Sequence, residues 1–418
     1  MQRLVFFASR HKFDYNIQKW YNVRVTKNNT AIYYMALQEE IIQMDSKIRE
    51  VVSNFRIDGE LVSVEENAQG NINSTYLLTY VTPEGSAKYL LQKINSNVFK
   101  EPYLVMRNIG LVSKHIKKKL AEMPECEYKT LSYVPTVANE PMYTHINEAG
   151  EKEYYRVYEY IDDCISYNNF KDSENPEEIA YNAGKCFGAF HMLLSDFPVS
   201  MLADTIPDFH NTPKRFDALL VAIENGITNR AFECSEEIIY LISKIKEYSA
   251  IYNKLGRTIP VRVTHNDTKL NNILMSATTN KGVAVIDLDT VMPGSVLYDI
   301  GDGIRSACAN SFEDETNPAK IFLNIDLAKA YIRGYLEEMA CSLTYDEVRC
   351  IGLSIRILTY ELALRFLTDY INNDTYFKIK YKTHNKARFM NQYLLLKDIE
   401  KKACEIDAYV EQLYKDVK

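Results

Sequence analysis

The sequence contains no C-x-x-C pair, although it has eight cysteines, at positions 126, 164, 186, 234, 308, 341, 350 and 404. Zinc ribbons and thioredoxin-type redox sites require that spacing, so both classes of site are disfavoured. Scattered cysteines are typical of proteins in a reducing compartment, and we therefore expect a cytoplasmic protein.

Long apolar runs and an excess of positive charge are also missing. No stretch approaches the roughly 18 apolar residues of a membrane span, and the apolar run in the first ten residues is too short for a signal peptide. The 49 basic residues are outnumbered by 56 acidic ones, which gives a net charge of −7. A general role in binding nucleic acid therefore lacks an electrostatic basis, and we expect neither a nucleic-acid nor a membrane partner.

The composition is that of an ordinary globular protein: 46% hydrophobic and 25% charged among 418 residues, enough for two or three domains. No internal repeat is visible. Residues 1–43 show no clear periodicity, whereas a helical pattern begins after Met35. We expect either that the native protein begins near Met35, with residues 1–34 as an extension, or that residues 1–43 form a true N-terminal arm.

The pattern along the chain changes from strand-like to helical. From about residue 60 it is strand-like, and the runs 76–81 and 88–94 flank a turn at 82–86, which predicts a β-hairpin. A helix over 102–120 and a strand over 153–161 follow. Beyond 165 apolar residues recur about every 3.6 positions. The helices predicted there lie near 179–194, 214–225, 235–253, 326–338, 345–371 and 386–415, with one β island at 261–287. This order predicts an α+β fold of two lobes, residues 44–161 and 162–418.

The β island carries the most specific group of polar residues. Asp267 and Asn272 lie in a polar loop after one strand, and Asp287 follows a later strand. Because these positions are at the ends of neighbouring strands, we expect two carboxylates and an amide to converge on a hard cation such as Mg²⁺. A remaining carboxylate can hold an acceptor hydroxyl and take its proton. Alternatively, any one of these residues only caps a turn.

The spacing His-x-Asp-x₄-Asn, followed about 15 residues later by Ile-Asp, resembles the catalytic and metal-binding loops of the protein-kinase fold. The version here is similar to that of the aminoglycoside phosphotransferase-like small-molecule kinases. The sequence segments that flank it are similar to those of the N-acetylhexosamine 1-kinases. The matching segments are 206–213 (IPDFHNTP), 265–272 (HNDTKLNN), 286–294 (IDLDTVMPG), 297–302 (LYDIGD) and 364–370 (LRFLTDY), with 70–76 (GNINSTY) and 91–95 (LQKIN) alike in style.

This resemblance covers about residues 55–395 and implies a bilobal protein-kinase-like fold. It implies a small antiparallel-sheet N-lobe that binds ATP and a larger, mainly helical C-lobe. Carried over by position, Asp267 is the catalytic base, and Asn272 and Asp287 hold Mg²⁺ against the ATP phosphates. His265 is expected to support the loop by hydrogen bonds.

The nucleotide contacts that the resemblance implies are less specific. A phosphate-binding turn is expected at Gly70, Asn73, Ser74 and Thr75. Lys93 would be the strand lysine that pairs with the phosphates, and Glu159 and Ile161 would form the hinge that contacts adenine. The alternatives are a plain hairpin turn, a lysine at a sheet edge and an ordinary strand end. The acidic partner of Lys93 is not evident from the sequence, although Glu101 is a candidate.

The acceptor contacts implied are Asp267, Thr290, Arg365 and Tyr376, because hydroxyl and guanidinium donors suit sugar oxygens and an acetamido carbonyl. Asp289 either orients the substrate or satisfies its own loop. The polar residues Asp208, His210 and Asn211 either line the pocket or cap a helix.

The resemblance implies ATP-dependent phosphorylation of N-acetylglucosamine or N-acetylgalactosamine to the α-1-phosphate, as in amino-sugar salvage, by a cytoplasmic monomer. A kinase of another sugar, an amino alcohol or an aminoglycoside is the nearest alternative. A nucleotide-binding pseudokinase is the alternative outside the enzymes. A metal-dependent phosphohydrolase would want histidine ligands, and a glycoside hydrolase would leave Asn272 unexplained.

Overall fold

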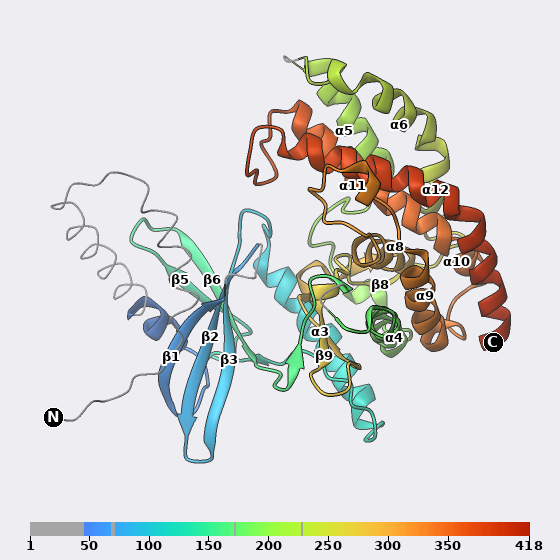
Figure 1. Ribbon diagram of the computed structural model, residues 1–418. Coiled ribbons are helices and arrows are strands. Elements are labelled where there is room, and N and C mark those ends of the chain that lie inside the picture. Colours follow the sequence, from blue (N-terminus) through green and yellow to red (C-terminus); the bar gives the residue numbers. More distant parts are fainter. Residues whose placement is uncertain (1–45, 68–71, 171–172, 227–228) are drawn as a thin grey trace, which may run out of the picture.

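The computed structural model describes residues 46–67, 72–170, 173–226 and 229–418, and it has the α+β, two-lobed architecture that the sequence predicts. Figure 1 shows a lobe of β-strands beside a larger lobe of helices, with the C-terminus in the helical lobe. The suspected extension 1–34 and Gly70 lie outside the described residues. The predicted lobe boundary after residue 161 stays a prediction.

The N-lobe is built on one antiparallel sheet in the order β1-β2-β3-β6-β4, with β5 also pairing with β6. Its strands are β1 (Glu60–Asn67), β2 (Ser74–Thr82), β3 (Gly85–Ile94), β4 (Tyr133–Val134), β5 (Tyr143–Ile146) and β6 (Lys152–Glu159). The predicted hairpin is β2–β3, which turns between Thr82 and Gly85.

Strand alternation gives this sheet two different faces. Leu78, Leu91 and Val157 belong to a small core with Val51 and Val52, which precede β1. Gln92 and Arg156 are neighbours of Leu91 and Val157 along their strands, so their side chains lie on the opposite face. That second face is turned toward the C-lobe.

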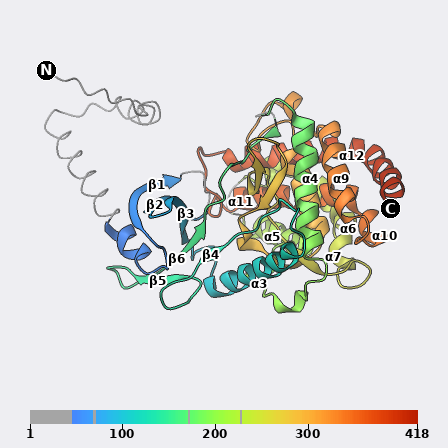
Figure 2. The ribbon, with the colours of Figure 1, turned by 90° about the horizontal axis from the view of Figure 1, so that it is seen from below.

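The C-lobe is mainly helical and includes one three-stranded and one two-stranded antiparallel sheet. The helix α3 (Pro102–Ala121) lies where the lobes meet (Figure 2). The other helices are α4 (Pro176–Leu193), α5 (Thr212–Asn225), α6 (Ser235–Tyr248), α7 (Ala250–Lys254), α8 (Val296–Ala307), α9 (Ile325–Met339), α10 (Tyr345–Val348), α11 (Ile351–Ile371) and α12 (His384–Val417). The strands are β7 (Cys164–Ile165), β8 (Arg262–Thr264), β9 (Ile273–Ser276), β10 (Gly282–Val285) and β11 (Met292–Gly294).

The structure adds one helix that the sequence pattern does not indicate. Helix α8 follows the polar motif at once and contains two glycines and two aspartates, residues with low helix propensity. Burial compensates for that propensity: α8 packs on α11, and α11 is buried along nearly its whole length. None of the helices in the described part of the chain is long and apolar enough to cross a membrane, and all eight cysteines are free thiols.

Helices α4 and α9 lie side by side at a very close approach (Figure 2). A Cβ atom added to Gly184 of α4 would overlap the main-chain oxygen of Tyr331, and one added to Gly334 of α9 would overlap that of Tyr181. This contact brings His191 of α4 to Tyr335 of α9, with 2.8 Å between Nδ1 and the hydroxyl oxygen. His191 in turn supports the loop described below.

We expect Gly184→Ala to lower the free energy of unfolding by about 1–3 kcal/mol, because the added methyl group forces the two backbones apart. Urea unfolding, followed by circular dichroism, measures the change. The matched control is Gly110→Ala in α3, where the new Cβ would meet the Tyr133 ring at an ordinary 3.6 Å. Equal stabilities of the two variants would contradict the close packing of α4 on α9.

Candidate active site

The loop after β8 is held in place by the carboxylate of Asp299 in α8. Its two oxygens accept the main-chain N–H groups of His265 and Asn266, at 2.6 and 2.7 Å. His191 contacts the same carboxylate at 2.8 Å, and Asp299 is only 1% exposed. Because breaking these bonds would leave buried polar groups unpaired, the backbone that leads to Asp267 is held in one conformation.

His265 supports the loop by hydrogen bonds, as predicted. Its Nε2 lies 2.8 Å from the main-chain oxygen of Ile286, and its Nδ1 lies 3.2 Å from the main-chain nitrogen of Asp267. A carbonyl oxygen can only accept, so Nε2 carries the proton and Nδ1 accepts the Asp267 N–H. The imidazole thus ties the Asp267 segment to the strand that ends before Asp287.

Asp267 lies between an amide and an ammonium group. Asn272 Nδ2 donates to the main-chain oxygen of Asp267 at 2.7 Å and approaches Oδ2 at 3.3 Å, while Lys269 Nζ is 2.9 Å from Oδ2. The carboxylate remains about one quarter exposed. Burial alone would lower the pKa of Lys269, but the charges of Asp267 and Asp287 raise it. Asp267 is therefore oriented and accessible, which is what a general base requires.

Asp287 is adjacent to Asn272 because β9 and β10 are paired. The main-chain nitrogen of Ile286 donates to the main-chain oxygen of Asn272 at 2.9 Å, and Asp287 itself adopts a left-handed conformation with φ of 58°. Burial, together with the negative charges of Asp289 and Asp267, raises the pKa of Asp287 to about 7. This excess of buried negative charge favours a bound cation.

The donor set fits a magnesium ion only in part. Asn272 and Asp287 offer an amide oxygen and a carboxylate, the ligand types that Mg²⁺ prefers. Within the described residues, no three His, Cys, Asp or Glu side chains group into a metal site by themselves. Phosphate and water oxygens would have to complete the coordination, which is how Mg²⁺ is commonly held.

A cavity of about 290 Å³ opens between the lobes above these residues. We call it the interlobe cavity. Predicted site residues that line it are Asn73, Thr75, Glu159, Ile161, Asn272 and Asp287. Ser74 does not line it. The structure therefore brings residues of the expected turn, hinge and metal site to one space, although the most distant of them, Asn73 and Asp287, are 214 positions apart (287 − 73) in the sequence.

Lys93 is not brought to the interlobe cavity. Its ammonium group binds Glu153 Oε1 at 2.8 Å, and Lys47 binds the other oxygen of Glu153 at 2.7 Å. The sequence correctly places Lys93 on the face of Leu91, but this face packs on the small N-lobe core rather than on the cavity. The acidic partner is thus Glu153 and not the suggested Glu101.

The side chain in the corresponding position on the cavity face is Arg156, which sequence reasoning missed. Its Nη1 lies 2.6 Å from Asp289 Oδ1, and both residues are almost fully buried. Asp289 Oδ2 accepts a hydrogen bond of 2.8 Å from Asn73 Nδ2. The available signal was an arginine within the apolar strand 153–161, since a buried charge requires a partner. Asp289 therefore joins the two lobes.

The residues expected at the acceptor are only partly grouped. Arg365 lies over the rings of Tyr376 and Phe377, at 6.0 and 5.4 Å. Thr290 is 7% exposed, and its hydroxyl donates to the main-chain oxygen of His265 at 2.6 Å. In the described chain no hydrogen bond links Thr290 to the Arg365 group. Thr290 therefore supports the loop after β8, which carries Asp267, rather than joining the Arg365 group.

Three buried polar atoms without a hydrogen-bond partner among the described residues lie near Glu361: His210 Nε2, Arg215 Nε and Tyr298 Oη. His210 Nδ1 contacts Glu361 Oε2 at 2.9 Å, and its ring lies 4.9 Å from that of Tyr298. Burial, and then the charge of Arg365, lowers the pKa of Arg215. Sequence reasoning considered His210 but missed Arg215 and Tyr298, whose types alone carry no signal.

The neighbouring polar residues act differently. Asn211 caps α5, since its side-chain oxygen accepts the Lys214 N–H at 3.1 Å. Asp302 pairs with Arg305 at 2.7 Å and lies within electrostatic range of both His210 and Lys269. Burial raises the pKa of Asp302, but the charges of Arg305, His210 and Lys269 lower it overall. His210 and Lys269 thus both lie within electrostatic reach of one carboxylate.

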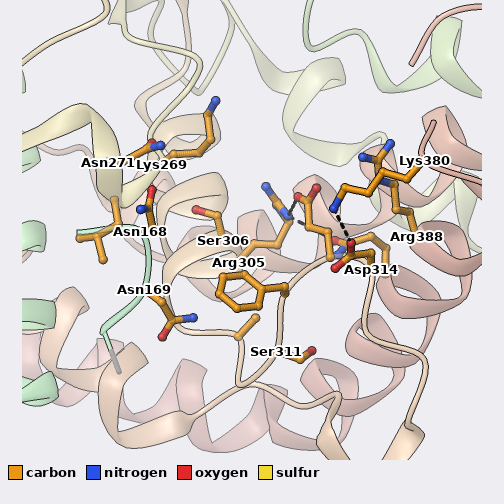
Figure 3. A pocket seen from close by; sticks show the side chains of 15 residues that line it. Asn168, Asn169, Lys269, Asn271, Arg305, Ser306, Ser311, Asp314, Lys380 and Arg388 are labelled. Atoms are coloured by element: carbon orange, nitrogen blue, oxygen red, sulfur yellow. Dashed lines mark hydrogen bonds and ion pairs between the residues drawn. The ribbon is translucent and has the colours of Figure 1, made fainter. Parts of the chain in front are cut away.

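A second cavity, of about 410 Å³, shares Asn168, Lys269 and Asn271 with the interlobe cavity. Figure 3 shows Lys269 and Asn271 at one side and Lys380 and Arg388 at the other, with Arg305 between them. Asp314 pairs with Lys380 at 3.2 Å. With four cations and two acids in its lining, this cavity is a poor environment for a positively charged ligand.

Comparison with known families and structures agrees with this geometry. A model of the phosphotransferase enzyme family matches residues 63–347, more than half of the chain. An aminopropanol kinase associated with a microcompartment has a similar structure, with a TM-score of 0.54 at 12% identity. That match covers 87% of this chain and 98% of the other.

Two further structures show the same fold. A choline kinase from Cryptosporidium parvum has a TM-score of 0.53 at 14% identity, covering 90% of this chain and 99% of that one. An amicoumacin kinase in complex with AMP-PNP and Ca²⁺ has a TM-score of 0.53 at 15% identity, covering 86% and 93%. At these identities the likeness establishes the bilobal kinase-like fold.

We expect Asp267→Asn to lower kcat about 10²–10⁴-fold, because the amide cannot accept a proton. Nucleotide affinity should remain close to that of the wild type, since Asp267 does not line the interlobe cavity. Steady-state kinetics and calorimetric titration measure the two quantities. The control is Asp217→Asn on the exposed face of α5. An Asp267→Asn variant as active as wild type would remove the base assigned here.

A second expectation concerns acid stability. Burial alone would raise the pKa of Glu153, but hydrogen bonds from Lys47, Lys93 and Tyr155 lower it to about 2. A lowered carboxyl pKa stabilises the fold above the unfolded value of about 4.3 and ceases to do so as the pH falls toward 2. The stability difference between wild type and Glu153→Gln should therefore shrink between pH 5 and pH 3.

Urea unfolding at pH 7, 5, 4 and 3 tests this, with Glu148→Gln at an exposed position as control. A stability difference that grows toward low pH would have the wrong sign.

Proposed function

The chain belongs to the phosphotransferase enzyme family, and from this premise we propose that it transfers the γ-phosphoryl group of ATP to a hydroxyl group of a small molecule. The observation that carries the proposal is the grouping of Asp267 with Asn272 and Asp287, the second and third of which line the interlobe cavity. The bound AMP-PNP and Ca²⁺ of the amicoumacin kinase support nucleotide and divalent-metal use in this fold.

ATP would enter with its adenine against the backbone of residues 159–161 and its phosphates toward Asn73, Thr75 and the floor of the cavity. Bound Mg²⁺, held by Asn272 and Asp287, would supply neutralisation of the phosphate charge. The buried carboxylates would otherwise repel the polyphosphate, so nucleotide and metal are expected to bind together.

In the transfer step the acceptor oxygen forms a bond to the γ-phosphorus while the bond from that phosphorus to the β–γ bridging oxygen breaks. Asp267 takes the proton of the acceptor hydroxyl, and ADP keeps the electron pair of the broken bond. Lys269, at 2.9 Å from Asp267, orients the carboxylate and adds positive charge beside the transferred group.

We further propose that the acceptor is N-acetylglucosamine or N-acetylgalactosamine, phosphorylated at C1 to the α-1-phosphate. Among the described residues, His210, Arg215 and Tyr298 hold buried polar atoms without a hydrogen-bond partner, and a polyhydroxylated ligand that reached them would satisfy these atoms. Arg365, held over Tyr376 and Phe377, is a guanidinium donor suited to an acetamido carbonyl. Both features agree with the sequence resemblance to N-acetylhexosamine 1-kinases.

A kinase of a cationic amino alcohol is the second candidate, because aminopropanol and choline kinases share the fold. The charge around the site argues against it. Arg215 and Arg365 lie close enough for one charge to affect the other, and the second cavity has more cations than acids in its lining. A cationic acceptor would be repelled from both places.

The test is a coupled ADP-release assay with Mg-ATP and a panel of acceptors: N-acetylglucosamine, N-acetylgalactosamine, glucose, galactose, choline and kanamycin. The expected result is turnover of one or both N-acetylated sugars, with a C1 phosphate identified by ³¹P NMR. Asp267→Asn serves as the inactive control.

Each outcome is informative. Turnover of choline or kanamycin alone would keep the phosphotransferase proposal and overturn the sugar pocket. Turnover of glucose as fast as N-acetylglucosamine would remove the role of Arg365 in reading the acetamido group. ATP binding without turnover of any acceptor would favour a pseudokinase.

A further inference from the structure

We propose that Arg156 on β6 contacts the phosphates of the bound nucleotide, in place of the strand lysine that the sequence pattern puts at Lys93, and that Asp289 is its positioning residue. This inference rests on the proposed use of ATP and adds a cationic side chain that binds the ATP phosphates. That side chain thus lies on β6, whereas the sequence motif indicates β3.

The interlobe cavity has two cationic side chains in its described lining, Arg156 and Lys269. Lys269 belongs to the loop after β8, which also carries Asp267, and it is paired with that carboxylate. Arg156 comes from the N-lobe wall, where β6 runs beside β3. A cation on that wall would face phosphates that the floor and Mg²⁺ neutralise only in part, because triphosphate carries several negative charges.

Arg156 takes the spatial place of a cavity-facing β3 side chain. Gln92 is its register partner on β3, and Lys93, the next residue, lies on the other face. Gln92 cannot supply charge, but its Oε1 accepts from both Nε and Nη2 of Arg156, at 3.0 and 2.8 Å. The amide thus fixes the plane of the guanidinium.

The guanidinium keeps one donor for a ligand. Arginine has five N–H groups. Nε and one N–H of Nη2 donate to Gln92, and Nη1 contacts Asp289 Oδ1 and Met106 Sδ. The second N–H of Nη2 has no acceptor in the described part of the chain. A phosphate oxygen in the cavity is the type of acceptor that it would take.

Asp289 links this arginine to the turn over the phosphates. One of its oxygens is 2.6 Å from Arg156 Nη1, and the other accepts from Asn73 Nδ2. The Asn73 oxygen in turn accepts the main-chain N–H of Asn95 at 3.0 Å. Asp289 Oδ1 is close to the guanidinium without accepting a well-aligned hydrogen bond. The carboxylate therefore balances the charge of Arg156 while leaving its donors incompletely used.

The competing explanation is that Arg156 and Asp289 form only a structural ion pair between the lobes. The two explanations differ in one measurable respect. A structural pair would affect adenosine and ATP equally, because both bind between the lobes. A phosphate contact affects affinity in proportion to the phosphates present, because adenosine offers no phosphate oxygen.

The experiment measures the dissociation constants of adenosine, AMP, ADP and ATP with Mg²⁺ by isothermal titration calorimetry. The wild type, Arg156→Gln, Arg156→Lys and Lys93→Gln are compared. We expect Arg156→Gln to weaken ATP binding at least tenfold while leaving adenosine affinity within about twofold, since a lost charge-assisted hydrogen bond has an effect of this order. Arg156→Lys should lose less, because it keeps the charge but not the paired contacts with Gln92.

The matched control is Arg262→Lys. Arg262 also pairs with a buried carboxylate, that of Glu347, at 2.8 and 3.0 Å, but it does not line the interlobe cavity. This variant should lose stability without changing the ratio of ATP to adenosine affinity. If Arg156→Gln does not fold, a several-fold selective loss of ATP affinity in Arg156→Lys is the required result.

Asp289→Asn tests the positioning role. It should raise the KM for ATP through loss of Arg156 orientation and leave adenosine affinity unchanged. Equal loss of adenosine and ATP affinity in the Arg156 variants, or a selective loss of ATP in Lys93→Gln alone, would overturn the inference. A wild-type protein that binds none of these nucleotides would instead overturn the proposed function.

Discussion

The buried carboxylate of Asp299 is the interaction on which the rest of the site depends. It accepts the N–H groups of His265 and Asn266 and contacts His191, so three distant segments meet on one side chain. His191 also contacts Tyr335 of α9, which α4 approaches closely at its glycines. An unpaired carboxylate at this depth would be costly, so these contacts hold the loop before Asp267 against α8 and α4.

Negative charge is the second constraint on the molecule. Asp267, Asp287 and Asp289 are gathered at the meeting point of the lobes, and burial, together with the charges of Asp289 and Asp267, raises the pKa of Asp287. Lys269 and Arg156 balance part of this charge within the protein. The remainder favours a divalent cation, which in turn favours polyphosphate. In the proposed phosphoryl-transfer site, the bound metal ion would neutralise the carboxylates that the fold gathers there.

The acceptor region follows a different principle, in which hydrogen-bonding groups are left unsatisfied rather than balanced. His210, Arg215 and Tyr298 hold buried polar atoms without partners in the described chain, beside the Arg365 group. Such groups raise the cost of the empty site and discriminate against ligands that cannot pair with them. The proposed sugar pocket thus concerns the group that would receive the phosphoryl group, whereas the proposed Arg156 contact concerns the nucleotide that would donate it.

The sequence by itself determined the two-lobed α+β fold, the hairpin, most helices and the group Asp267, Asn272 and Asp287, because strand and helix periods and a fixed motif spacing are local properties. It could not determine which face of β3 meets the cavity. Lys93 shares a face with Leu91, but only the packing of 46–52 against that face showed that it is turned away. The pairing of Arg156 with Asp289, across 133 positions (289 − 156), depends on how the lobes meet. Helix α8 likewise forms against its local propensity because burial on α11 outweighs it.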